Sequence, residues 1–406
     1  MSDVEAAQNI QKHIYLERLG LDIYLWAGIA GVAVLGVSIA LSYFLGWGQR
    51  FFYSYLVNYV YFLSLSLGAL FFVSLQHLTR SGWSVTVRRI AEIFAANSAL
   101  MAVLFIPIFI GMSSLYPWTN HELVAHDALL QGKQPYLNIP FFVIRCLFYF
   151  ASWIYLSQYF LNRSLEQDKT GDANLTLRME RLSAPGMALF ALTITFAAFD
   201  WLMSLDPRWF STIYGVYFFT GCVVGFIALL AVTAFLLQSS GRLTGAITIE
   251  HYHDLGKLLF GFIFFWGYIA FSQYMLIWYA NLPEETGWIF RRTDIHEGQW
   301  GWVGLILFFG HFIIPFLGLI SRYPKRRKRL LVFWAVWALI AHWLDLYWLV
   351  MPEYSPQLAS LHLLDITCFI GIGGLYFALA ARIAKGRALL PIRDPRLEES
   401  LNFENA

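Results

Sequence analysis

The sequence carries little charge for its length. Of its 406 residues, 13% are Asp, Glu, Lys or Arg and 58% are hydrophobic, and the mean hydropathy is +0.57. A soluble domain usually carries about 25% charged residues. The net charge of +2 is too small to indicate nucleic-acid binding. These proportions predict an all-α membrane protein that crosses the bilayer many times.

The chain also has few cysteines. Cys146, Cys222 and Cys368 each lie alone in an apolar segment, without CxxC, CxxCH or zinc-type Cys/His spacing. Disulfides, Fe–S clusters and c-type haem are therefore not expected in this chain. Paired histidines of the b-type haem pattern and a P-loop are absent from the sequence as well. Residues 1–21 are polar and lack the apolar core of a signal peptide, so none is expected.

Long apolar runs dominate what is present. About 20 apolar residues cross the hydrocarbon core as a helix, and ten segments meet this length. We expect one integral membrane domain over residues 1–406, with no soluble domain. The predicted spans are 23–45, 56–75, 90–112, 141–161, 187–205, 213–237, 258–280, 302–320, 331–350 and 361–381.

The basic residues predict the orientation of these helices. Of the 28 lysine and arginine residues, 22 flank the same side of the predicted bundle as the two termini. The opposite side has five, and Arg145 lies within the fourth helix. By the positive-inside rule both termini are cytoplasmic. We interpret the dense basic block at 322–329 as a topology anchor that faces anionic lipid.

A weak internal repeat divides the chain into two units. Asp200 precedes Pro207 and Asp345 precedes Pro352 by the same offset, at the outer ends of the fifth and ninth helices. This offset of four helices predicts two four-helix bundles, helices 2–5 (56–205) and helices 6–9 (213–350), flanked by helices 1 and 10.

Charged side chains inside these apolar helices are the candidate functional residues, because such charges are costly in a membrane. The motif His-x-x-Asp occurs in helix 9 (His342 and Asp345) and again in helix 10 (His362 and Asp365), and the spacing puts both side chains on one helix face. Together with Asp200, these residues form a hypothetical proton path to the outer side. A His₂Asp₂ metal site is an alternative, and helix capping is another interpretation of His362 and Asp365.

Two more charged residues have a structural alternative. Arg145 is a candidate for an ion pair with one of the aspartates, which would remove two charges from lipid together. Glu92, in the inner half of helix 3, could take up protons from the cytoplasm, or it could pair with Arg88 or Arg89 on its own first turn.

Three stretches resemble a known family. Residues 199–207 (FDWLMSLDP), which lead into 211–215 (STIYG), resemble the F subunit of bacterial alternative complex III, and so do residues 271–286 (FSQYMLIWYANLPEET). The basic block that follows 311–316 (HFIIPF) also fits. The resemblance extends over the ten predicted helices.

The resemblance implies an NrfD-like, multi-pass subunit of the bacterial inner membrane. Such a complex oxidises quinol, for example menaquinol, and passes electrons to a cytochrome c, a copper protein or an oxidase, in a respiratory or photosynthetic electron transport chain. The F subunit is implied to carry no redox cofactor and to help in proton translocation. Haem c and Fe–S clusters belong to partner subunits. A related C subunit next to an Fe–S subunit usually holds the quinol site, although some descriptions of the family call the F subunit quinone-binding.

Two other classes remain open from the sequence. A secondary transporter also has about ten helices and a repeat, but its substrate site usually interrupts helices at the midplane. Only the run Gly371–Gly374 in helix 10 comes near that pattern. An assembly scaffold without chemistry is the third class.

Overall fold

The computed structural model describes residues 13–296 and 298–405, and in this part of the chain ten helical segments are long and apolar enough to cross a membrane. The all-α prediction with ten spans is thereby confirmed. The prediction that residues 1–21 contain no signal peptide falls partly on residues 1–12, which lie outside the described residues. The spanning segments are α2 (Glu17–Phe44), α3 (Gly48–Leu78), α4 to α6 (Val85–Ile110), α10 (Ile139–Thr170), α11 (Asn174–Trp201), α12 (Tyr214–Ser239), α13 (Ile249–Ala280), α15 to α16 (Trp300–Leu319), α18 (Lys328–Val350) and α19 (Leu363–Ala384).

Two of these segments are built from shorter pieces. The third consists of α4 (Val85–Ala95), α5 (Ser98–Leu104) and α6 (Ile106–Ile110). The eighth consists of α15 (Trp300–Leu307), a π-helical stretch η3 (Phe308–Ile313) and α16 (Ile314–Leu319). The elements in the connections are α7 (Met112–Leu115), η1 (Pro117–Thr119), α8 (His121–Ala125), α9 (Ala128–Lys133), η2 (Met203–Leu205), α14 (Pro283–Thr293), α17 (Arg322–Arg326) and η4 (Met351–Glu353), and α20 (Leu397–Leu401) follows the last spanning helix.

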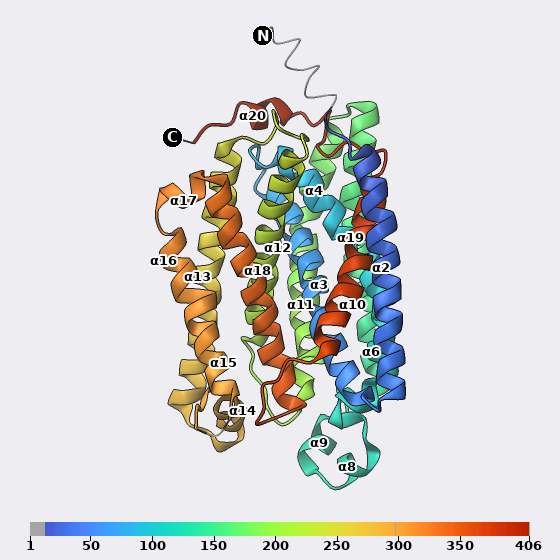
Figure 1. Cartoon of the computed structure of the whole chain (residues 1–406), viewed down its shortest axis with the longest axis vertical. Helices are drawn as coiled ribbons and strands as arrows, with labels where there is room; N and C mark the ends of the chain where they lie inside the picture. The colour runs from blue at the N-terminus through green and yellow to red at the C-terminus, as the bar shows by residue number, and fades with distance from the viewer. Residues whose placement is uncertain (1–12, 297, 406) are drawn as a thin grey trace.

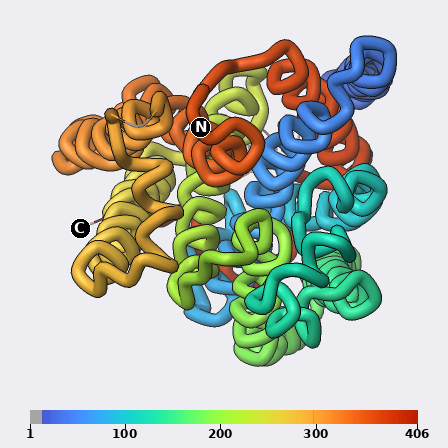
Figure 2. The backbone as a smooth tube through the Cα atoms, turned by 90° about the horizontal axis from the view of Figure 1, so that it is seen from below, coloured from blue at the N-terminus to red at the C-terminus, as the bar shows by residue number. Residues whose placement is uncertain are grey.

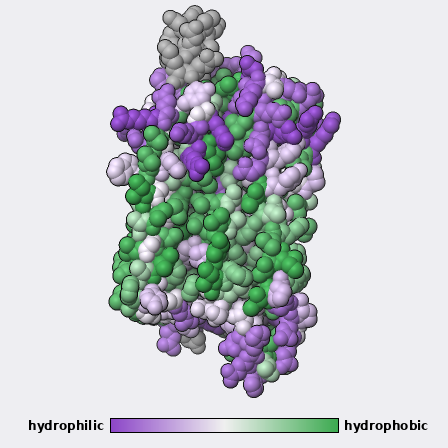
Figure 3. All heavy atoms as spheres, turned by 90° about the vertical axis from the view of Figure 1, so that its right-hand side faces the viewer, coloured by the Kyte–Doolittle hydropathy of each residue, from purple (hydrophilic) through white to green (hydrophobic). Residues whose placement is uncertain are grey.

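The two ends of the bundle differ. Figure 1 shows α17, α20 and the start of α2 at one end, and α8, α9 and α14 at the other. We call these the basic end and the loop end. Figure 3 shows a hydrophobic band between two hydrophilic ends, as a membrane protein requires.

Helices α3 and α12 form the centre of the molecule. Most of the apolar stretch of each is buried, 94% for α3 and 78% for α12. They pack against each other, and α12 also packs on α13 and α18. Viewed along the helices, α13 to α16 lie on one side and α2 and α10 on the other (Figure 2). Helix α2 is mostly exposed and packs chiefly on α19.

Three helix boundaries differ most from the prediction. Helices α10 and α11 continue to Thr170 and from Asn174, through the region predicted as a long inner loop, because polar residues beyond the apolar core still favour a helix. Helix α13 begins at Ile249, so the histidines at 251 and 253 lie in its opening turns rather than in a loop.

Tryptophans near the outer ends of the helices lie in two different surroundings. Trp278 and Trp302 are exposed, as a membrane-interface role requires, but Trp201, Trp209 and Trp300 are buried in the protein. Trp209 stacks on Trp288, with ring centroids 4.0 Å apart. A tryptophan near a helix end therefore marks either the interface or a contact between the end segments.

Candidate functional site: buried ionisable residues between the helices

Asp200 at the end of α11 is held by an ion pair with Arg145 of α10. The Arg145 guanidinium donates to both carboxylate oxygens, Nε to Oδ2 and Nη2 to Oδ1, each at 2.8 Å. Tyr149 Oη donates to Oδ2 at 2.7 Å. Arg145 also stacks on the Tyr136 ring at 3.9 Å. The aspartate partner of Arg145 is therefore Asp200, and the pair brings no net charge into the bundle.

Asp365 at the start of α19 is paired too, with Arg50 of α3. Arg50 Nη2 lies 2.5 Å from Asp365 Oδ2, and Ser54 Oγ donates to Oδ1 at 2.6 Å. The Asp365 carboxylate also accepts from the His362 backbone N–H, while His362 Nδ1 accepts from the Leu364 N–H. The capping interpretation of these two residues is confirmed, and Asp365 in addition joins α19 to α3.

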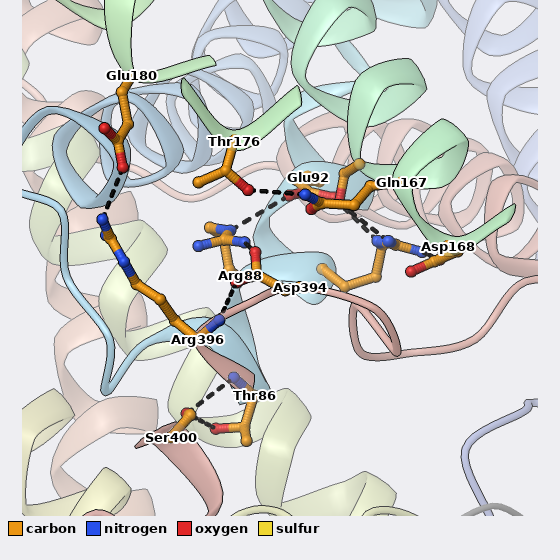
Figure 4. A network of polar contacts seen from close by, with 12 residues as sticks. Thr86, Arg88, Glu92, Gln167, Asp168, Thr176, Glu180, Asp394, Arg396 and Ser400 are labelled. Atoms are coloured by element: carbon orange, nitrogen blue, oxygen red, sulfur yellow. Dashed lines mark hydrogen bonds and ion pairs between the residues drawn. The ribbon is translucent and has the colours of Figure 1, made fainter. Parts of the chain in front are cut away.

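Glu92 of α4 lies in a larger cluster of charges at the basic end. Arg89 Nε donates to Glu92 Oε2 at 2.9 Å, and Arg88 Nε lies 3.5 Å from Oε1. Arg88 pairs with Asp394, and Arg89 with Asp168 at 2.8 Å. Figure 4 shows Arg88 between Glu92 and Asp394. Glu92 therefore has both predicted arginine partners, and the side chain is fully buried.

Residues after α19 cover this cluster. The Ala388 carbonyl accepts from Arg89 Nη1 at 3.3 Å, and Ile392 N donates to Asp168 Oδ1 at 2.9 Å. Farther along, Arg396 donates to Glu180 at 2.8 Å. We call residues 385–405 the C-terminal segment.

Asp345 of α18 has different surroundings. Tyr217 Oη of α12 donates to Asp345 Oδ1, and Trp266 Nε1 of α13 donates to Oδ2 at 3.3 Å. Its side chain is buried, and within the described part of the chain no ion pair reaches it. Asp345 therefore differs from Asp200, Asp365 and Glu92 in having only neutral hydrogen-bond partners.

His342 lies one turn before Asp345 in α18 and has one free nitrogen. Its Nε2 is 2.8 Å from Ser64 Oγ of α3, whereas its Nδ1 has no partner among the described residues. Two glycines of α12 make room for the ring. A Cβ at Gly221 would lie 3.0 Å from His342 Cε1, and one at Gly225 would lie 2.8 Å from Cδ2.

His311 in η3 adds a second buried imidazole. Its ring stacks on Trp266 with centroids 4.0 Å apart, and neither nitrogen has a partner in the described structure. Trp266 thus contacts His311 with its ring face and Asp345 with its N–H. A π-helix often marks a functional position, and this one places His311 inside the bundle.

The residues of the hypothetical metal site do not come together. Asp365 is bound to α3 and Asp345 to α12 and α13. Over residues 13–296 and 298–405, no group of three or more His, Cys, Asp or Glu side chains could hold a metal ion. The His₂Asp₂ alternative from the sequence is therefore wrong for this arrangement.

One further charged pair lies at the loop end, outside the spanning segments. Arg292 of α14 donates to Glu353 Oε1 at 2.8 Å and stacks over the Trp288 ring at 3.8 Å. Burial lowers the pKa of Arg292 from its ordinary value, and the Glu353 carboxylate opposes that shift. The pair ties α14 to the end of α18.

Sequence reasoning missed the partners of Asp345 and His342. Tyr217, Trp266 and Ser64 look like ordinary residues of apolar helices. The available signal was the pair Gly221 and Gly225, because two small residues four apart mark close helix contact.

No known protein-family model matches the chain, and no curated protein matches it in sequence at a significant level.

Proposed function

We propose that this chain is a proton-conducting membrane subunit of a quinol-oxidising electron-transfer complex, and that Asp345 is its proton carrier. One observation supports the choice of Asp345: its carboxyl is buried among neutral hydrogen-bond donors. A carboxyl in such a place can bind and release a proton without breaking an ion pair. His342, one turn away, and Tyr217 are the groups next to it that can pass a proton on.

The other members of the hypothetical path receive a structural role in this proposal. Asp200, Asp365 and Glu92 each hold an arginine, so a change in their protonation would leave a buried cation unpaired. In this proposal these three carboxylates join helices and do not carry protons. Glu92, the candidate for proton uptake from the cytoplasm, neutralises Arg88 and Arg89 beside Asp168 and Asp394 in this proposal.

The proposed complex is of the alternative complex III type, in a bacterial inner membrane. The motifs at 199–215 and 271–286 support this assignment by resemblance. Partners would be a related NrfD-like C subunit, an Fe–S subunit and c-type cytochrome subunits. They would carry the Fe–S clusters and haem c, and menaquinone would bind at a neighbouring subunit.

We propose two four-helix bundles that meet at α3 and α12. In support of the first, α3 packs on α4 and α11, and α10 packs on α4 and α11; in support of the second, α12 packs on α13 and α18, and α16 packs on α13 and α18. Helices α2 and α19 pair with each other at the side of α3. Both termini would face the cytoplasm, because the basic end carries most lysines and arginines.

Purification of the native protein in mild detergent tests the assignment to a complex. A tag placed beyond Ala406, mass spectrometry and a visible spectrum are sufficient. We expect haem c and Fe–S subunits to co-purify. A colourless single polypeptide would contradict the complex and favour a secondary transporter instead.

The substitution Asp345→Asn tests the proton carrier. The complex is reconstituted in liposomes, and proton movement per quinol oxidised is followed with a pH indicator. We expect Asp345→Asn to abolish the proton movement that exceeds quinol chemistry, because an amide cannot bind a proton at neutral pH. The variant Asp345→Glu keeps a carboxyl and should retain this additional proton movement. If the Asn variant moves protons like the native complex, Asp345 is not the carrier and a scaffold role is favoured.

A further inference from the structure

A cavity of about 440 Å³ lies in the loop-end half of the bundle, beside the Asp345 site. Its walls come from α12, α13, α14, α15, η3 and α18. Tyr217 and Trp266, the two hydrogen-bond donors to Asp345, form part of its inner wall. The proposed proton carrier is thus separated from the cavity by one layer of side chains.

The cavity is elongated along the helices. On α13 its lining runs from Trp266 to Tyr274, a rise of about 12 Å at 1.5 Å per residue. On the facing segment the lining runs from Gly301 to Phe312, which corresponds to about 16 Å. The lining thus extends over about 12 to 16 Å parallel to the helices, a length that suits an extended chain better than a compact molecule.

The lining is almost wholly apolar and carries no ionisable acid or base other than tyrosine. Gln273 and Thr293 are its polar members, and both lie towards the loop end. Gln273 Oε1 accepts from Ser211 Oγ at 3.2 Å. The opening faces outward, since the lining residues Phe271 and Phe308 are 57% and 48% exposed. Between two spanning helices such an opening meets hydrocarbon.

From this shape, polarity and opening we infer that the cavity binds one acyl chain of a membrane lipid. The chain lies parallel to α13, with its ester and headgroup at the loop end beside Gln273 and Thr293. The inference of a lipid site does not depend on the proposed function. If Asp345 is the proton carrier, the bound chain also keeps water from reaching it through this wall.

Photo-crosslinking tests the site directly. The native protein, with any subunits that co-purify, is placed in nanodiscs that contain phosphatidylcholine with a diazirine in one acyl chain, and labelled peptides are identified by mass spectrometry after washing with unlabelled lipid. We expect α13 and η3 peptides around Phe271 and Phe308 to keep their label after the wash. Label on other lipid-facing helices should be lost. Equal loss everywhere would mean that only exchanging boundary lipid contacts the cavity.

A filling substitution supplies the matched comparison. Ala270→Trp puts an indole into the cavity, whereas Ala191→Trp puts one on the exposed surface of α11. We expect the first variant to lose the retained lipid and the second to keep it. Leu305→Trp fills the same space from the opposite wall, in case the first variant does not assemble. Retention of lipid in both filled variants would overturn the inference.

Native mass spectrometry of the wild-type complex identifies the occupant. We expect one retained mass per copy that matches a two-chain phospholipid and disappears in the filled variant. A retained ring-containing lipophile would overturn the acyl-chain inference, and it would leave the proton-carrier proposal untouched. Conversely, failure of the Asp345→Asn test leaves the lipid result unchanged.

Discussion

The ion pair between Arg145 and Asp200 predicts a large and specific loss of stability when one partner is removed. Asp200 is fully buried and Arg145 is 8% exposed. Removing one member of a buried pair typically costs about 3–5 kcal/mol, because the other charge is left without compensation. We expect Arg145→Met to reach this range, since Tyr149 is the only other side chain that donates to the Asp200 carboxylate in the described structure.

Asp200→Asn should cost less. The orphaned Arg145 keeps the Tyr136 carbonyl as an acceptor at 2.9 Å and the faces of two aromatic rings. A charged group that retains part of its hydrogen bonding loses about 1–3 kcal/mol. The double variant should then be more stable than the sum of the single losses implies. We expect a coupling energy of about 1–3 kcal/mol, as found for residues in direct contact.

Unfolding in mixed micelles, followed by tryptophan fluorescence, measures these three variants. A double-mutant cycle on the exposed pair Arg208 and Asp127 at the loop end is the matched control. The coupling energy of this pair should be much smaller, because solvent screens the two charges. The reasoning would be refuted if Arg145→Met unfolded like the native protein, or if both cycles gave the same coupling.

Two further predictions follow from the same geometry. Gly225→Ala should destabilise the protein by about 1–3 kcal/mol through crowding of His342, while Gly36→Ala, which meets nothing within 4 Å, should not; the melting temperatures of the two variants decide this. The hydrogen bond from Arg208 lowers the pKa of the Asp127 carboxyl, so the stability from this contact is present above the unfolded pKa and disappears only as the pH falls through the lowered folded value. The protection factors of the α8–α9 amides, with the intrinsic pH dependence of amide exchange divided out, should therefore be constant near neutral pH and fall in acid, and a fall between pH 6 and 8 would contradict the assignment.

Hydropathy was sufficient to find the spans but not their full lengths. The ten apolar runs coincide with the ten spanning segments because the bilayer selects length and polarity directly. Helices α10 and α11 extend beyond their apolar runs, where solvent replaces lipid and the hydropathy signal ends. The π-helical stretch at His311 has no signature that hydropathy could detect.

Contacts within one helix could be predicted to the residue, whereas a contact between helices could be predicted only by residue type, as for Arg145 with one of the aspartates. The i,i+3 spacing correctly suggested Glu92 with Arg89 and the His362–Asp365 cap. By contrast, Arg50 and Asp365 are far apart in the sequence, and nothing in the spacing of either residue indicates the other. The proposed role of each buried carboxylate depends on whether it has an ion-pair partner, and this is decided by such long-range contacts.

The C-terminal segment has a consequence for the synthesis of the protein. A chain emerges from the ribosome N-terminus first, so Arg88 is made long before Asp394, its partner. Among the described residues, Glu92 and, later, Asp168 are the carboxylates that pair with Arg88 and Arg89 until translation is complete. The basic end can therefore close only after the last helix has been inserted. A chain that stops before residue 394 would therefore keep Glu92 as the only carboxylate paired with Arg88 among the described residues.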